Sequence, residues 1–252
     1  EKMQDAIALR KYFSDNGVSV GHANRIQHFL REHYSKAPTL HEVDVPVLKI
    51  LPDTLMMKLH TEVFLPTASI HPLIAELQRD SVGIREVCHH AMAELPTESK
   101  VSIFHTGSAC TKMYFIAAGD VGYRNKRGER QLDEDRKWLC EAPLWMPWWN
   151  RGTAIAYTSC DVIVLDCTKF GEIVSCRPDC WSLPVKRYAA FFVDHVQGDW
   201  AHATDLPEDP AVLTELIQMS FMKMGGHGHF NSASMSATLN DSYSISNRFR
   251  QS

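Results

Sequence analysis

The chain has 252 residues, 44% hydrophobic and 22% charged, which is the composition of an ordinary globular protein with a sizeable core. Its 26 basic and 30 acidic side chains give a formal net charge of −4, which argues against a surface built to bind nucleic acid or an anionic membrane. No apolar run approaches the roughly 20 residues of a membrane-spanning helix. The chain starts at Glu1 rather than Met, so we expect further sequence upstream.

Periodic apolar residues predict that the first hundred residues form short amphipathic helices that must pack on one another or on a partner. The pattern stops at Asn16-Gly17, and Pro66 is expected to end the fourth helix. The expected helices cover residues 3–13, 20–34, 42–51, 53–66, 70–77 and 84–91.

From Met92 the pattern changes to short β-prone runs separated by tight turns, which is typical of a small antiparallel barrel or sandwich. The expected strands are 100–104, 113–116, 121–124, 153–157 and 162–165. Helices are then predicted over 169–176 and 184–196. A last helix has Asp209 as its N-cap and Pro210 at its first position, and the Gly/Ser/Asn-rich chain beyond Gly225 is expected to be disordered.

The seven cysteines are an odd number and are scattered along the chain, unlike a secreted disulfide framework. Cys176 and Cys180 could begin a zinc site, but no second pair accompanies them. The histidines, including His89 and His90, also lack the spacing of metal ligands. We therefore expect reduced thiols in a cytosolic protein and no metal site.

The order of these elements and several motifs resemble one family. The stretch MYFIAAGDVGY, residues 113–123, is similar to the strand–glycine–strand signature of cyclic-nucleotide-binding domains, and it follows a glycine turn at 106–108. Upstream, RIQHFLREHYS, VLKILPDTLMMKLH and HPLI resemble the C-linker of cyclic-nucleotide-gated, hyperpolarisation-activated and ether-à-go-go channels. The resemblance covers about residues 1–197.

This resemblance implies an α+β fold in which a helical C-linker precedes an antiparallel β-roll with flanking lid helices. The expected divisions are the C-linker at 1–66, the roll at 67–197, a linker with a C-terminal helix at 198–224 and a disordered tail at 225–252. It also implies a cytosolic gating module of a voltage-gated cation channel of the potassium type. Such modules form homotetramers through the C-linker and reach the membrane only through a transmembrane region outside this sequence.

The phosphate cassette of the family reads Phe-Gly-Glu, then eight residues, then an Arg. The Glu accepts a hydrogen bond from the ribose and the Arg pairs with the cyclic phosphate. Laid on this sequence without gaps, 139–141 (Leu-Cys-Glu) takes the first position and Asn150 the Arg position. A shift of one residue places Arg151 there, but requires an insertion within 142–150. Both registers remain open.

Two departures argue against nucleotide binding. Cys140 and Cys110 stand where the family has glycines, and a cysteine adds a side chain at a backbone that a phosphate must approach closely. Trp145, Trp148 and Trp149 bring large apolar surfaces to a loop that normally surrounds an anion. These tryptophans are candidates to fill the pocket, or they pack on the roll.

We therefore expect a degenerate pocket, no required cofactor, and an ion pair between Arg151 and Glu141. The alternative is a module that binds cAMP or cGMP and moves the helix at 184–196. Its binding residues would be Cys140, Glu141, Arg151, Gly152 and Thr153.

Other classes fit less well. A transcription factor would need a basic helix-turn-helix after the roll, and residues 198–224 offer a single helix with one lysine. For an enzyme, Ser108 near His105 is the best nucleophile and base, but neither lies in a nucleophile elbow. We expect no catalytic residue and no nucleic-acid partner.

Overall fold

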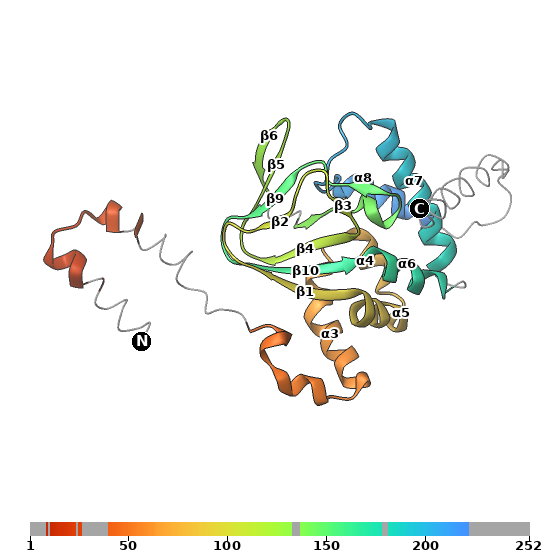
Figure 1. Cartoon of the computed structure of the whole chain (residues 1–252), viewed down its shortest axis with the longest axis horizontal. Helices are drawn as coiled ribbons and strands as arrows, with labels where there is room; N and C mark the ends of the chain where they lie inside the picture. The colour runs from red at the N-terminus through yellow and green to blue at the C-terminus, as the bar shows by residue number, and fades with distance from the viewer. Residues whose placement is uncertain are drawn as a thin grey trace. The chain divides into compact units, whose positions relative to one another are not determined.

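Figure 1 shows the chain as a computed structural model, which describes residues 9, 11–23, 25–26, 40–132, 137–177 and 181–221. The chain forms two compact units, Glu1–Asp44 and Val45–Ser252. In the first unit, the helix containing residues 11–15 ends at Asn16-Gly17, as predicted, where Gly17 has φ of +62°. The predicted disordered tail lies outside the described residues, as do most of the expected helix at 20–34 and part of that at 3–13.

Short helices precede the roll; the first of them, η1, lies at the end of the first unit, and the others belong to the second unit. Their bounds, with two 3-10 helices first and a π-helical turn last, are η1 Glu42–Asp44, η2 Pro46–Ile50, α3 Asp53–Ala68, α4 Pro72–Leu77, α5 Ser81–Glu86 and η3 Val87–Ala91.

Two predictions about the prolines in this region are wrong. The single helix expected over 42–51 is broken at Val45, which has φ of −121° and ψ of 75°, because a residue before proline is disfavoured in the helical region. Pro66 lies inside α3 rather than ending it. It occupies the last turn, so the lost N–H bond and the crowding of the carbonyl four residues earlier affect only the C-terminal part of the helix, which ends at Ala68.

Within the described residues, the roll consists of ten strands in antiparallel pairs. Figure 1 shows these strands together with the helices before and after them, which confirms the predicted α+β class. One sheet has the order β1-β10-β4-β7, a second has β2-β9-β5-β6, and β3 pairs with β8. The bounds are β1 Met92–Thr97, β2 Ser102–Phe104, β3 Ala109–Cys110, β4 Lys112–Ala118, β5 Val121–Asn125, β6 Gly128–Gln131, β7 Trp138–Leu139, β8 Trp148–Trp149, β9 Thr153–Ala156 and β10 Cys160–Asp166.

The central strands β4 and β10 carry the interior of the roll. Met113 and Phe115 on β4 and Leu165 on β10 have no measurable exposure. The predicted turn between β4 and β5 contains Gly119 at φ of +93°, where a Cβ atom would lie 2.6 Å from the Cys160 sulfur. This turn therefore requires glycine both for its backbone angle and for its close packing on β10.

In the part of the chain that the structure describes, three helices follow the roll: α6 Cys167–Ser175, α7 Leu183–Gly198 and α8 Pro210–Phe221. Asp166 caps α6 by accepting a hydrogen bond from the Lys169 N–H. The predicted start of α8 is confirmed, because the Asp209 carboxylate accepts from the Ala211 N–H at 2.9 Å and Pro210 is the first helical residue. α8 packs against both α7 and α4, so the end of the chain's described part contacts the helices before the roll (Figure 1).

Within the described residues, every helix is either too short or too polar to cross a membrane.

Candidate ligand-binding site

The cassette runs from β7 through a 3-10 helix, η4 (Ala142–Leu144), to β8 and β9. Cys140 has φ of +61°, a left-handed conformation that costs a residue with a side chain about 1 kcal/mol. The backbone therefore keeps the shape that a glycine would adopt, and the Cys140 side chain is buried beside Asn150. Position 140 therefore combines a glycine-like backbone conformation with a buried side chain.

Glu141 is 6% exposed and its carboxylate has three protein partners. Oε2 lies 2.9 Å from Nε2 of His71, while Oε1 accepts from the Tyr188 hydroxyl at 2.6 Å and from the Trp145 indole N–H at 3.4 Å. Nδ1 of His71 accepts from the Leu73 N–H, so the ring proton is on Nε2 and is donated to Glu141. The buried carboxylate is thus satisfied without a ligand.

These contacts join three parts of the fold through one side chain. His71 is the N-cap of α4, Trp145 follows η4, and Tyr188 lies on α7. Burial, with the Glu141 carboxylate beside it, holds the pKa of Tyr188 well above its ordinary value, so the hydroxyl remains a donor. Glu141 therefore ties the helix before the roll to the helix after it.

Asp205, in the loop between α7 and α8, inserts its carboxylate into the cassette. It is 1% exposed. Oδ2 accepts from the backbone N–H groups of Arg151 at 2.7 Å and Gly152 at 2.9 Å, and from the Tyr123 hydroxyl at 2.8 Å. Oδ1 accepts from the Trp148 indole N–H at 2.6 Å. Two consecutive backbone N–H groups with two side-chain donors form an anion-binding site, and Asp205 fills it.

The surroundings of Asp205 act on its ionisation in opposite directions. Burial raises the pKa of the Asp205 carboxyl, and hydrogen bonds from Trp148, Tyr123, Gly152 and Arg151 oppose that rise. The backbone adds a further contact, because the Asp205 carbonyl accepts from the Cys140 N–H.

Arg151 points its guanidinium onto aromatic rings. Its Cζ lies 5.0 Å from the centroid of Trp148 and 4.2 Å from that of Trp200. Trp200 precedes Asp205 in the same loop, so this cation–π stack holds the loop from its outer side. The expected ion pair between Arg151 and Glu141 is wrong, because Glu141 bonds to other side chains and Arg151 stacks on indoles.

The neighbouring cassette residues fix the loop to the roll. Asn150, 4% exposed, donates to the Ser108 hydroxyl, and its carbonyl oxygen faces the Cys140 thiol. The Thr153 hydroxyl accepts from the Thr106 N–H at 3.1 Å. Of the two residues that could take the Arg position of the cassette, Asn150 is therefore the one that faces the interior of the roll.

The three candidate tryptophans have different environments. Trp148 is 3% exposed and reaches Asp205, and Trp145 packs edge-on against Phe170 and Tyr188. Trp149 is 56% exposed.

A groove of about 590 Å³ lies between η4, α6 and α7. Its lining includes Trp145, Phe170 and Val185 but not Glu141 or Gly152. The groove is therefore separate from the anion position that Asp205 occupies.

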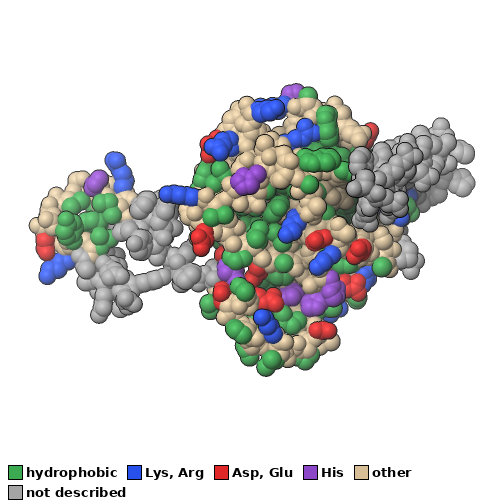
Figure 2. Space-filling view, viewed as in Figure 1, with side chains coloured by type: hydrophobic (Ala, Val, Ile, Leu, Met, Phe, Trp, Pro, Cys, Tyr) green, Lys and Arg blue, Asp and Glu red, His purple; other side chains and the backbone are tan. Residues whose placement is uncertain are grey.

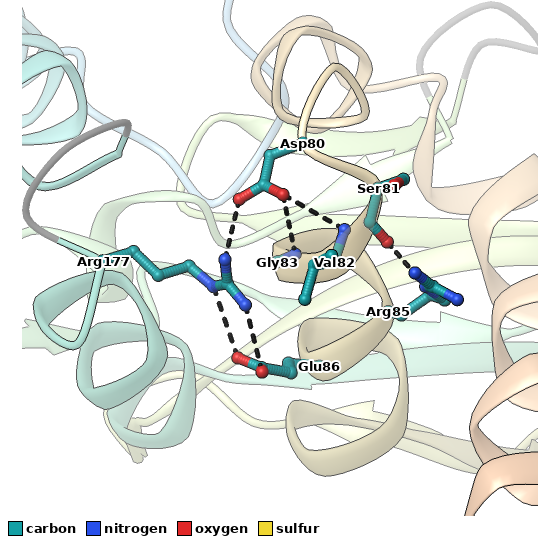
Figure 3. Close-up of polar contacts among 7 residues, drawn as sticks. All are labelled: Asp80, Ser81, Val82, Gly83, Arg85, Glu86 and Arg177. Atoms are coloured by element: carbon teal, nitrogen blue, oxygen red, sulfur yellow. Dashed lines mark hydrogen bonds and ion pairs between the residues drawn. The ribbon is translucent and has the colours of Figure 1, made fainter.

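A second polar connection links the corner between α6 and α7 to α5 (Figure 3). The Arg177 guanidinium contacts Asp80 at 2.9 Å and Glu86 at 3.0 Å, and Asp80 also caps α5 through the N–H groups of Val82 and Gly83. A Cβ atom on Gly83 would lie 2.6 Å from the Trp181 ring, so this corner packs directly on α5. The Arg177 contacts therefore fix the corner between α6 and α7 relative to α5.

The residues that contact the cassette from distant parts of the sequence were not predicted. Asp205 lies 53 positions beyond Gly152, in what looks like a polar linker, and His71 lies 70 positions before Glu141. Tyr188 has the helical spacing of a core residue. The one available signal is His71-Pro72, which is typical of a helix N-terminus and places a polar side chain at a cap.

The structure is therefore an antiparallel β-roll with helices before and after it and a cassette loop whose anion position is filled from within the chain. No family model matches this chain, and no curated protein sequence matches it. Several solved structures match the structure of this chain. The C-linker/CNBHD of zELK channels, crystallised in the presence of cAMP, is 15% identical and covers 82% of this chain and 97% of its own, with a TM-score of 0.45.

A second crystal form of that C-linker/CNBHD is 14% identical over 71% of this chain and 92% of its own, with a TM-score of 0.42. A cyclic nucleotide-binding-like protein from Brucella abortus is 17% identical over 44% of this chain and 97% of its own, with a TM-score of 0.38.

Proposed function

We propose that this chain is the cytosolic regulatory module of a cation channel of the potassium type. In this proposal, residues 1–66 are a C-linker that assembles as a homotetrameric ring beneath the pore, and residues 67–197 are a cyclic-nucleotide-binding homology domain. The motifs at 113–123 and 139–154, in the order the family has, support this assignment. The module couples the ring to the gate and is not an enzyme.

We further propose that the pocket does not respond to cyclic nucleotide, because the chain supplies its own anion. The observation that carries this proposal is the Asp205 carboxylate, which takes four hydrogen bonds from the cassette and the roll. A cyclic phosphate would need the same backbone N–H groups of Arg151 and Gly152. It would also need the Arg151 guanidinium, which stacks on Trp148 and Trp200 instead.

Glu141 supports the same conclusion from the ribose side. Its oxygens bond to His71, Tyr188 and Trp145, so a ribose hydroxyl would have to compete with three protein donors for this carboxylate. In place of a ligand, Glu141 and Arg177 connect the lid helix to α4 and α5. In this proposal α7 stays connected to α4 and α5 at all times, in the arrangement that a bound nucleotide would otherwise induce.

Isothermal titration calorimetry with cAMP and cGMP tests this function. We expect no heat from either nucleotide up to millimolar concentration. Binding at micromolar concentration would instead favour the alternative, in which nucleotide displaces Asp205, pairs with Arg151 and moves α7. An upstream sequence without six hydrophobic spans would contradict the channel assignment itself.

A further inference from the structure

Two histidines from different helices meet at the joint between α3 and the roll. Nδ1 of His60, on α3, lies 3.0 Å from Nδ1 of His89, on η3, and the two ring centroids are 5.0 Å apart. Both side chains are half-buried, and His90 beside them is exposed. Figure 2 shows histidine side chains gathered on the surface of this helical region.

Packing fixes the direction of both rings. His60 stacks on Phe64, one helical turn along α3, with centroids 5.2 Å apart, and His89 packs edge-on against His90 at 4.6 Å. Phe64 on one element and Val87 and Cys88 on the other are fully buried at the contact between α3 and η3. The two nitrogens are therefore held together by helices that pack tightly, not by mobile loops.

We propose that His60 and His89 form a chelating site for a late first-row divalent transition metal, with Cu²⁺ bound most tightly. Each Nδ1 would direct a lone pair at the ion, with the N–H of each neutral ring on Nε2. At a metal–nitrogen distance of about 2.05 Å, a separation of 3.0 Å between the nitrogens gives an N–metal–N angle of about 94°.

That angle selects the class of metal. Adjacent ligands of the tetragonal or octahedral ions Cu²⁺ and Ni²⁺ lie near 90°, whereas tetrahedral Zn²⁺ would need the nitrogens about 3.3 Å apart. The intrinsic order of affinities also favours Cu²⁺. Among the described residues, no group of three or more His, Cys, Asp or Glu side chains is placed to hold an ion, so water would complete the coordination. An ion here would clamp α3 to η3, which immediately precedes β1.

The test is titration of the full chain with Cu²⁺ and Ni²⁺. His227 and His229 near the C-terminus are additional imidazoles, so every protein should carry His227→Gln and His229→Gln. In that background we expect one Ni²⁺ per chain by calorimetry. His60→Gln or His89→Gln should each weaken binding by about tenfold or more, because a chelate loses one of its two ligands. The double variant should bind at least as weakly as the weaker single variant.

Matched controls are His105→Gln and His202→Gln, both at exposed histidines outside the pair, which should leave the affinity unchanged. The Cu²⁺ electron paramagnetic resonance spectrum supplies a readout that does not depend on any substitution at the site. It should show hyperfine splitting from two nitrogens in the background protein. Absence of binding, equal loss in the control variants, or splitting from fewer than two nitrogens would overturn the proposal.

Discussion

Replacing Asp205 tests the self-filled pocket through the stability of the fold. Asp205→Ala removes the acceptor of four hydrogen bonds and leaves the donors of Tyr123, Trp148, Arg151 and Gly152 without a partner. Each such bond contributes about 0.5–1.5 kcal/mol, and removal of a buried carboxylate recovers part of that through lost desolvation. We expect a net loss of about 2–4 kcal/mol in the free energy of unfolding.

Asp205→Asn separates the roles of the two oxygens. The amide oxygen can replace Oδ2 and keep three donors, but the amide NH₂ then faces the Trp148 N–H, which is also a donor. The loss should therefore be about 1–2 kcal/mol, smaller than for alanine. The assay is urea unfolding followed by tryptophan fluorescence and circular dichroism. The matched control is Asp194→Asn, at an exposed position of α7, which should change stability by less than about 0.5 kcal/mol.

The pH dependence of the same pair gives the sign of the electrostatic effect. Burial raises the pKa of folded Asp205 above its ordinary value of 3.8, so the folded state binds a proton more readily than the unfolded state. Wild-type protein should therefore gain stability relative to Asp205→Asn as the pH falls from neutral through the raised folded pKa toward 3.8. Stability of Asp205→Ala within 0.5 kcal/mol of wild type, or a pH trend of the opposite sign, would refute the reasoning.

Further predictions concern the joints around the cassette. Gly83→Ala should lower the free energy of unfolding in urea by about 1–3 kcal/mol, because the new methyl group would lie 2.6 Å from the Trp181 ring. The control is Gly171→Ala, whose methyl group would have no atom within 4 Å. It should leave the stability unchanged or raise it slightly. Equal effects of the two would contradict the close packing of α5 on the corner. Tyr188→Phe should lower the free energy of unfolding by about 1–2 kcal/mol, because it removes a donor to Glu141. A change within experimental error would mean that this hydrogen bond does not hold α7 in place.

The fold was predictable to the extent that its elements carry a periodic pattern. The predicted strand at 113–116 lies within β4, and the four apolar residues that indicated it are all buried. The start of α8 was predicted from Asp209 and Pro210. The strands β3, β7 and β8 have two residues each, too few for any alternation to show. They are set by pairing across the roll, which a local reading of the sequence cannot detect.

The candidate site was predictable only as a loop. Glu141 and Arg151 were found because the spacing of the cassette identifies them. At Cys140 the backbone has a glycine-like conformation, and the difference lies in the buried side chain that the cysteine adds. His71 and Tyr188, which contact Glu141, and Trp200, which stacks on Arg151, come from segments far away in sequence. An ion pair between Glu141 and Arg151 was the simplest expectation because both lie in one loop. Asp205 supplies the missing charge instead, because the loop after α7 folds back over the cassette.

Hydrogen exchange at the Arg151 and Gly152 amides, followed by NMR, tests whether Asp205 occupies the anion position of the cassette. We expect both amides to be protected in the wild-type chain and to keep their exchange rates and chemical shifts in millimolar cAMP. We expect Asp205→Ala to remove the protection of both. Rapid exchange of these two amides in the wild-type chain, or a shift of both on addition of micromolar cAMP, would contradict it.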